Sequence, residues 1–202
     1  MFKSILVMES AWEGNSLKPI SVWPLVEGFA FAADIKAFHR NFTDTDSFKY
    51  WIRIFNNKRN NYPSPKLLYI AAHGTHNQVS SIGNNINRDT IFNTLKKSRN
   101  IEYVHFGSCL FGNNENLHTL LKTARHIRMA AGYNESVDWV DSTAFDLMLW
   151  QRISTREENV KNKKLQTVVE DYVNNEVAGL AKKLGFRCKY RYGKSVRSIK
   201  VE

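Results

Sequence analysis

The chain has 202 residues, of which 43% are hydrophobic and 24% charged, a mixture typical of an ordinary globular protein. This composition excludes collagen-like, low-complexity and wholly disordered chains. A chain of this length buries about 70% of its unfolded surface, so its stability requires neither disulfides nor metals. Lys and Arg number 29 against 19 Asp and Glu, and the net charge of +10 favours an anionic partner.

The N-terminus and the two cysteines predict a cytoplasmic protein. The apolar run at residues 5–8 is too short for a signal-peptide core and ends at Glu9. No window contains the ~18 apolar residues of a membrane span, so we expect no membrane association. In the cytoplasm Cys109 and Cys188 are independent reduced thiols. The absence of Cys-x-x-Cys and His-x-x-x-His spacing predicts no metal site.

Predicted strands and helices alternate along the first part of the chain. The run at 5–8 is typical of a buried strand, and helical spacing follows over 22–35. A second strand is predicted at 36–42. A helix over 43–55 begins with Thr43-Asp44-Thr45-Asp46, residues that favour a helix cap.

The middle of the chain continues this alternation. A nearly all-apolar strand at 67–72 stops abruptly at His73-Gly74, and the polar stretch 75–87 predicts a hairpin or flap. Beyond it, helices are predicted over 88–95 and 115–126, and strands over 101–106 and 127–132.

The last third combines helical and strand patterns. A helix is predicted over 137–153, followed by one long charged helix over 157–184 that Gly185 ends. Residues 186–192 alternate apolar and basic side chains, the pattern of a strand with one buried and one wet face. With its apolar central strands, the chain predicts one α/β domain, whose mostly parallel sheet carries helices on both faces. Within it, residues 1–151 form the catalytic core, and 152–202 form a basic helix with edge strands.

Two reactive side chains follow predicted neighbouring strands. His73 comes directly after the strand at 67–72, and Cys109 comes directly after the strand at 101–106. In open parallel sheets, catalytic groups gather beyond the carboxyl ends of the strands. We therefore expect His73 and Cys109 to face each other across a short gap.

This pairing suits nucleophilic catalysis. A free thiol is mostly protonated at neutral pH, and a nearby imidazole takes its proton or stabilises the thiolate. Gly74 would let a substrate carbonyl approach closely, and the backbone N–H groups of Gly74 and Cys109 are candidates for an oxyanion hole.

The motifs Tyr69-Ile70-Ala71-Ala72-His73-Gly74 and Val104-His105-Phe106-Gly107-Ser108-Cys109 resemble those of the caspase-like (clan CD) cysteine peptidases. The resemblance implies a caspase-like three-layer sandwich and a catalytic dyad of His73 and Cys109. Caspases carry Gln-Ala-Cys-[Arg/Gln/Gly]-Gly with the histidine about 50 residues upstream. Here Gly-Ser-Cys-Leu-Phe-Gly follows His73 with a gap of 36 residues, closer to small bacterial CHAT-like proteins. The arginines behind the Asp preference of caspases have no counterpart, so that specificity is not carried over.

Other residues near the strand ends have both a structural and a functional interpretation. His76 is an alternative base, whereas the alternation around Cys188 and the position of His105 within a strand favour packing. Glu9, Tyr133, Asp138 and Trp139 are candidates for a substrate pocket, and Asp141 is a further acid that would suit a basic substrate residue. The structural interpretation of the 136–139 segment, which the sequence favours, is a helix cap at Ser136 or Asp138 and a core Trp139.

The positive charge is concentrated near the C-terminus. Residues 152–202 hold 13 Lys or Arg against 6 Asp or Glu, and six cations are predicted on one face of a terminal hairpin: Arg187, Lys189, Arg191, Lys194, Arg197 and Lys200. Because the tyrosines alternate to the opposite face, the sequence favours a protected sheet edge or an acidic protein partner over nucleic acid.

We therefore expect a cysteine endopeptidase that acts on a protein or peptide substrate without metal or organic cofactor. By fold analogy, control by a partner in trans and a bacterial stress or defence pathway are expected. The alternative is a non-catalytic caspase-like or flavodoxin-like module that binds an acidic protein or nucleic acid through the basic C-terminal region.

Overall fold

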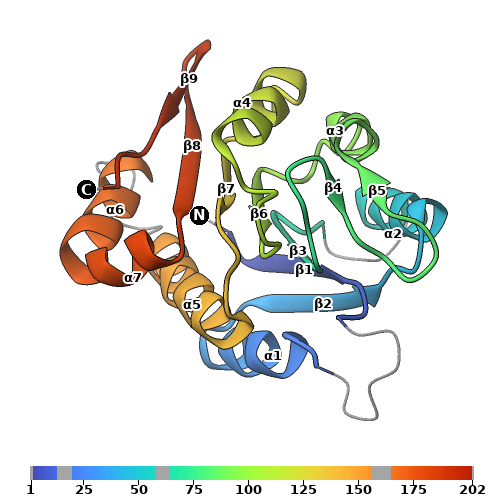
Figure 1. Cartoon of the computed structure of the whole chain (residues 1–202), viewed down its shortest axis with the longest axis horizontal. Helices are drawn as coiled ribbons and strands as arrows, with labels where there is room; N and C mark the ends of the chain where they lie inside the picture. The colour runs from blue at the N-terminus through green and yellow to red at the C-terminus, as the bar shows by residue number, and fades with distance from the viewer. Residues whose placement is uncertain (1, 13–19, 58–63, 156–164, 202) are drawn as a thin grey trace.

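The computed structural model describes residues 2–12, 20–57, 64–155 and 165–201. A seven-stranded sheet runs through them in the order β2-β1-β3-β6-β7-β8-β9 (Figure 1). Its strands are β1 (Ser4–Glu9), β2 (Lys36–Asn41), β3 (Leu67–Ala71), β6 (Tyr103–Phe106), β7 (Met129–Tyr133), β8 (Phe186–Tyr192) and β9 (Ser195–Ser198). Pairing is parallel from β2 to β7 and antiparallel from β7 through β8 to β9. The predicted α/β fold with a mostly parallel sheet is confirmed.

The strands are apolar on both faces because helices cover both. In β1, Ile5 and Val7 belong to one hydrophobic core, and Leu6 and Met8 belong to the other. A continuous apolar run, rather than an alternating one, is what a strand between two helical layers requires.

Two sets of helices form the outer layers. One core includes residues from α1 (Trp23–Ala32), α5 (Trp139–Thr155), α6 (Leu165–Asp171) and α7 (Ala178–Lys183), and the other includes α2 (Thr45–Asn56), α3 (Arg88–Lys96) and α4 (Asn114–Thr123). The predicted cap of α2 is Asp44, whose carboxylate accepts the backbone N–H of Ser47 at 2.7 Å. The polar stretch 75–87 contains the predicted hairpin, formed by β4 (Gln78–Val79) and β5 (Ile86–Asn87).

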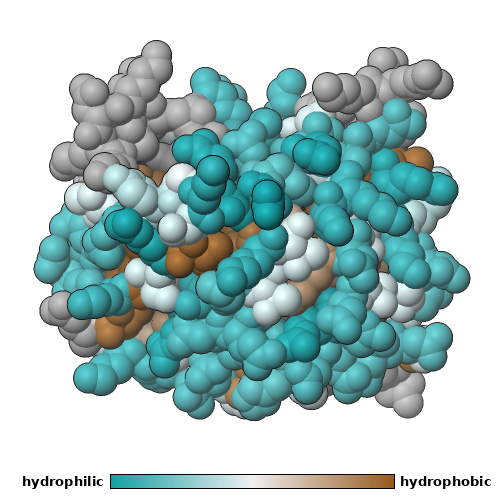
Figure 2. Space-filling view, turned by 90° about the horizontal axis from the view of Figure 1, so that it is seen from above, coloured by the Kyte–Doolittle hydropathy of each residue, from teal (hydrophilic) through white to brown (hydrophobic). Residues whose placement is uncertain are grey.

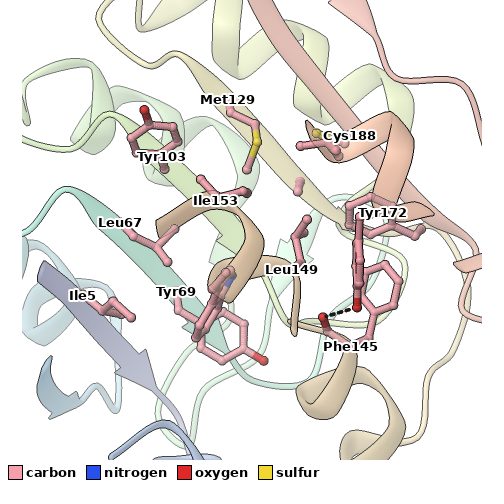
Figure 3. Packing of buried hydrophobic residues seen from close by; sticks show 14 of the residues in the cluster. Ile5, Leu67, Tyr69, Tyr103, Met129, Phe145, Leu149, Ile153, Tyr172 and Cys188 are labelled. Atoms are coloured by element: carbon pink, nitrogen blue, oxygen red, sulfur yellow. Dashed lines mark hydrogen bonds between the residues drawn. The ribbon is translucent and has the colours of Figure 1, made fainter. Parts of the chain in front are cut away.

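Helix α5 packs against the sheet through buried side chains. Leu149 and Ile153 lie among side chains of the central strands, including Leu67 and Tyr69 (Figure 3). The Tyr172 hydroxyl donates to the carbonyl oxygen of Phe145 at 3.1 Å and so fixes the following helical segment against α5.

The C-terminal helical segment differs from the prediction of one long helix over 157–184. Residues 157–164 lie outside the described residues, and the remainder consists of α6, a π-helical turn at Tyr172–Glu176 and α7. The break falls at Val177 (φ −138°, ψ 32°), whose N–H bonds the carbonyl of Tyr172 five residues back. The π turn lets the chain keep Tyr172 and Val173 buried on α5 and still redirect α7 toward β8.

In the described part of the chain, no helix combines the length and the apolar character that crossing a membrane demands.

Candidate active site

The strands that precede His73 and Cys109 are neighbours, as predicted. β3 pairs with β6 in parallel, from Leu67 opposite Tyr103 to Ile70 opposite Phe106. Parallel strands end at the same edge of a sheet, so the segments that carry His73 and Cys109 emerge side by side.

Gly74 sits where these two segments touch. A Cβ at this position would lie 2.7 Å from the carbonyl oxygen of Cys109 and 2.9 Å from the Cβ of Ser108. Both distances are shorter than real Cβ contacts, so only glycine allows this approach. The His-Gly dipeptide therefore brings the histidine segment against the cysteine segment.

One ring nitrogen of His73 is held by a backbone carbonyl. Nε2 lies 2.6 Å from the carbonyl oxygen of Trp12, and the two rings meet edge to face at 5.3 Å. Because a carbonyl oxygen only accepts hydrogen bonds, Nε2 is the nitrogen that carries a proton here, so Nδ1 is the ring nitrogen that can accept one. The exposed His73 ring thus presents a basic nitrogen on the side away from Trp12.

Glu9 anchors the side chain of Trp12 through a hydrogen bond. Its buried carboxylate accepts four donors, namely Trp12 Nε1 at 2.9 Å, Ser21 Oγ at 2.7 Å, Val22 N at 2.9 Å and His39 Nε2 at 2.8 Å. Burial is the largest single influence and raises the pKa of Glu9, but the four hydrogen bonds together lower it below its ordinary value. Glu9 lines a hollow of about 370 Å³ together with Trp12, yet both carboxylate oxygens already serve internal donors.

Cys109 is half-buried, and its sulfur contacts the loop that follows β7. The backbone N–H of Val137 donates to Sγ at 3.4 Å. The thiol in turn faces the carbonyl oxygen of Val137, with Sγ at 3.9 Å, so the backbone of Val137 fixes the position of the sulfur. Neither this amide nor the Trp12 carbonyl could be found in the sequence, because a backbone atom leaves no residue-type signal.

The backbone directly after Cys109 is in a rare conformation. Leu110 has φ 62°, and the N–H of Phe111 donates to the carbonyl of Cys109 at 2.6 Å, which closes a three-residue turn. A non-glycine residue in this region costs about 1–3 kcal/mol, and such residues cluster at functional sites. The turn is held by the post-β7 loop, since Leu110 N bonds Glu135 O at 3.2 Å and Gly112 N bonds Tyr133 O at 3.0 Å.

The backbone amides of Gly74 and Cys109 donate no hydrogen bond within the described residues. Gly74 faces Val79 in an isolated antiparallel bridge, and the hydrogen bonds of that bridge come from the flanking residues. These bonds run from Thr75 N to Gln78 O at 2.9 Å and from Ser80 N to His73 O at 2.8 Å. The Gly74 N–H is thereby left available to a ligand.

The candidate pocket residues beyond Glu9 occupy different environments. Tyr133 is fully buried and its hydroxyl donates to Asp146, so its side chain does not reach a cleft and the pocket assignment fails for it. Asp138 caps α5 by accepting Val140 N at 2.9 Å and Asp141 N at 3.0 Å, as the structural interpretation of this segment predicted. Trp139 is half-buried at the first turn of α5.

The remaining cysteine and histidines also have structural surroundings. Burial raises the pKa of the Cys188 thiol well above its ordinary value, which agrees with its predicted packing role. His76 is exposed, and its carbonyl accepts Asn116 Nδ2 at 2.7 Å. His105 is fully buried within β6, as expected, and its Nδ1 accepts Trp150 Nε1 at 3.0 Å.

A buried polar cluster under the strand ends was not anticipated from the sequence. The Asp146 carboxylate on α5 accepts the Tyr133 hydroxyl and lies 2.9 Å from His105 Nε2. Burial, followed by the charge of Asp146, raises the pKa of both Tyr69 and Tyr133 well above the ordinary tyrosine value. The cluster joins β3, β6 and β7 to α5 behind the candidate site.

Within the ranges that the structure describes, no three His, Cys, Asp or Glu side chains gather as metal ligands would.

Comparisons with known proteins place the fold. No protein-family model and no curated protein matches the sequence. Among solved structures, the chain is similar to a secreted C11 cysteine protease from Bacteroides thetaiotaomicron, solved with an irreversible peptide inhibitor, with a TM-score of 0.52 and 9% identity. The match covers 93% of this chain and 66% of that protease, so the chain spans less than two thirds of its neighbour.

The fold is therefore that of the caspase-like cysteine proteases. The similarity is to a C11 protease and gives no support to a closer relationship with CHAT-like proteins. At this low identity the likeness concerns the fold, and the chemistry has to be argued from the chain's own residues.

Proposed function

We propose that the chain is a cysteine endopeptidase in which Cys109 is the nucleophile and His73 the general base. The observation that carries the proposal is the meeting of His73-Gly74 and Cys109 at the ends of paired strands in a caspase-like sheet. A cysteine protease with the same fold supports peptide-bond hydrolysis as the reaction class.

The hydrogen bond between His73 and Trp12 suits the first step. With Nε2 donating to Trp12, Nδ1 is the nitrogen that takes the thiol proton. The backbone of Val137, whose N–H and carbonyl oxygen both face Sγ, holds the sulfur in position. Trp12 and Val137 act as positioning residues, since each works through the dyad and not on the substrate.

The thiolate attacks the scissile carbonyl carbon and forms a C–S bond. The negative charge that develops on the carbonyl oxygen is stabilised by the free amides of Gly74 and Cys109. As the C–N bond breaks, the leaving amine takes the proton from His73. Water, deprotonated by His73, then hydrolyses the thioester and regenerates the thiol.

The substrate class that follows is a protein or peptide. Control by a protein partner in trans, and a place in a bacterial stress or defence response, extend the proposal by analogy with caspase-like proteases. The spacing of 36 residues between His73 and Cys109 is the feature behind a CHAT-like variant of this proposal.

A peptide-library cleavage screen tests the proposal. Wild-type protein should cleave a subset of peptides, and Cys109→Ala should cleave none. His73→Ala should slow cleavage by about 10²–10⁴-fold, the usual contribution of a general acid–base group. His76→Ala is the matched control, because it removes a second exposed histidine of the same loop and should leave cleavage unchanged.

Alkylation of Cys109 by iodoacetamide separates the dyad from substrate specificity. His73→Ala should slow alkylation of this thiol at neutral pH, whereas His76→Ala should not. If Cys109 reacts no faster than a buried thiol and His73→Ala has no effect, the dyad is wrong. The non-catalytic binding module then becomes the better description.

A further inference from the structure

The strongest feature that the protease proposal does not use is a cationic surface at the opposite edge of the sheet. Two hollows there share Lys122 and Arg125. One, of about 690 Å³, lies between α4 and the β8–β9 hairpin and includes Arg191 and Lys194. The other, of about 460 Å³, lies beside the ends of α3 and α4 and includes Lys96 and Arg99. We call the two together the cationic groove.

Topology separates the groove from the candidate active site. Lys96 and Lys122 stand at the carboxyl ends of α3 and α4, and Arg99 and Arg125 lie in the loops that lead into β6 and β7. These loops precede the strands, whereas Cys109 follows one. Antiparallel β8 ends at the same edge, because Tyr190 lies opposite Met129, the first residue of β7. The groove therefore faces away from Cys109.

Its charges are not neutralised within the described part of the chain. Lys96, Arg99, Lys122, Arg125 and Lys194 are exposed, and none of them forms an ion pair with a carboxylate there. No Asp or Glu lines either hollow. The negative charge of Glu102 acts to raise the pKa of neighbouring His126, but Glu102 is itself paired with Lys66 and Arg128.

The concentration of positive charge in the groove helps to lower the pKa values of Arg191 and His126, which lie among these cations. Burial and, after it, the charge of Arg125 lower the pKa of Arg191. Burial likewise lowers the pKa of His126, and the charges of Arg99 and Arg191 add to this effect. Arg191 has an internal role, since its guanidinium donates to the carbonyl oxygen of Leu121 in the last turn of α4 and to that of Ile127 in the loop before β7. The exposed cations have no such role.

The residues that line the cationic groove distinguish between two polyanionic partners, an acidic protein and a nucleic acid. The cores of protein interfaces are enriched in aromatic side chains and depleted of Lys, Asp and Glu. Val196 is the one aliphatic side chain that lines the groove within the described residues, and the hollow beside α3 has none. Figure 2, which looks down from the α4 side of Figure 1, shows mainly hydrophilic surface with smaller hydrophobic areas. A line of exposed cations without an apolar centre suits repeated phosphates.

We propose that the cationic groove binds the phosphate backbone of a nucleic acid. The sequence assigned the basic surface to the C-terminal hairpin, where tyrosines and cations alternate. The structure adds α3 and α4, so backbone binding does not depend on a stacking platform in the hairpin. Such a site would place the chain on a nucleic acid while leaving the candidate active edge exposed, and it does not rest on the protease proposal.

Fluorescence anisotropy with labelled 20-nucleotide probes tests the inference, using single-stranded DNA, single-stranded RNA and duplex DNA in parallel. The protein carries Cys109→Ala, so loss of peptidase activity cannot alter the result. With about five phosphate contacts, log Kobs should fall against log salt with a slope near −3.5 for single strands or −4.5 for a duplex. The probe that binds most tightly at the same salt concentration identifies the preferred form.

The double variant Lys122→Ala/Arg125→Ala removes the two cations that both hollows share. The slope for single strands should become shallower by about 1.4, which amounts to roughly 10- to 100-fold weaker binding at 50 mM salt. The matched control is Lys36→Ala/Lys49→Ala, which removes the same charge from exposed sites outside the groove. It should bind within about twofold of the parent.

Three results would overturn the inference: no measurable binding at 50 mM salt, equal weakening by both double variants, or tighter binding of labelled polyglutamate than of any oligonucleotide. The last result would assign the groove to an acidic protein. Each double variant should melt at the same temperature as the parent protein, which shows that a change in its binding does not come from unfolding.

Discussion

Gly74→Ala is the most direct test of the contact between the two strand ends. The added methyl group would meet the carbonyl oxygen of Cys109 at 2.7 Å, where ordinary contact begins at 3.4 Å. One of the two segments therefore has to move by about 0.7 Å. Overpacking of this kind costs about 1–3 kcal/mol.

This cost has two measurable consequences. For a chain of this size, each kcal/mol changes Tm by about 2–4 °C, so the melting temperature should fall by about 2–12 °C. A displacement that approaches 1 Å at a reacting centre costs roughly 100-fold in rate. Peptide cleavage should fall accordingly, and alkylation of Cys109 should slow.

Gly28→Ala provides the matched control. Gly28 lies in α1, and a Cβ there would meet nothing within 4 Å. Alanine is favoured over glycine in a helix by about 1 kcal/mol, so this variant should melt about 2–4 °C higher with unchanged alkylation. If Gly74→Ala instead matches wild type in both Tm and alkylation rate, the two segments do not meet as described.

Three further predictions concern buried groups. The pKa of Glu9 is lowered in the folded state. Its carboxylate therefore stabilises the fold when the pH is above the ordinary glutamate pKa of about 4.3. This contribution to the free energy of unfolding is lost as the pH falls through the folded pKa. Urea denaturation should show the stability difference between wild type and Glu9→Gln growing as pH rises through that range; a constant difference contradicts the argument. Asp146→Ala should cost about 1.5–3 kcal/mol, because it removes the charged acceptor of the Tyr133 hydroxyl and leaves that hydroxyl only the carbonyl oxygen of Ser142; a loss below about 1 kcal/mol in the same assay argues against the buried cluster. Peptide mapping should find Cys188 unmodified by iodoacetamide in native protein and modified only in denaturant, because burial raises the pKa of its thiol; rapid native labelling would contradict this.

Much of the fold was predictable because its signals are local. Asp44 caps α2, apolar runs mark the strands, and the hairpin lies in the polar stretch 75–87. The order of His73 and Cys109 along alternating strands and helices was sufficient to predict neighbouring strand ends. Each of these inferences depends on spacing over a few residues or on the geometry of a parallel sheet.

The long helix expected over 157–184 shows where local pattern is insufficient. Its apolar stripe is real, since Val169, Tyr172 and Val173 are buried. The break at Val177 arises from packing against α5 and β8, which tertiary contacts impose and helix propensity does not register.

What the sequence determined by itself is the class of sheet, the positions of its strands and the two side chains proposed for chemistry. Tertiary structure alone decided what surrounds them: the Trp12 carbonyl at His73, the Val137 amide at Cys109 and the Asp146 cluster behind both. It also revealed that basic charge from α3, α4 and the terminal hairpin meets in one groove. The physical reason is the range of the interactions, because caps and periodicity act between near neighbours in the chain. A carbonyl, an amide or a cation acts on whatever the folded chain places within a few ångströms.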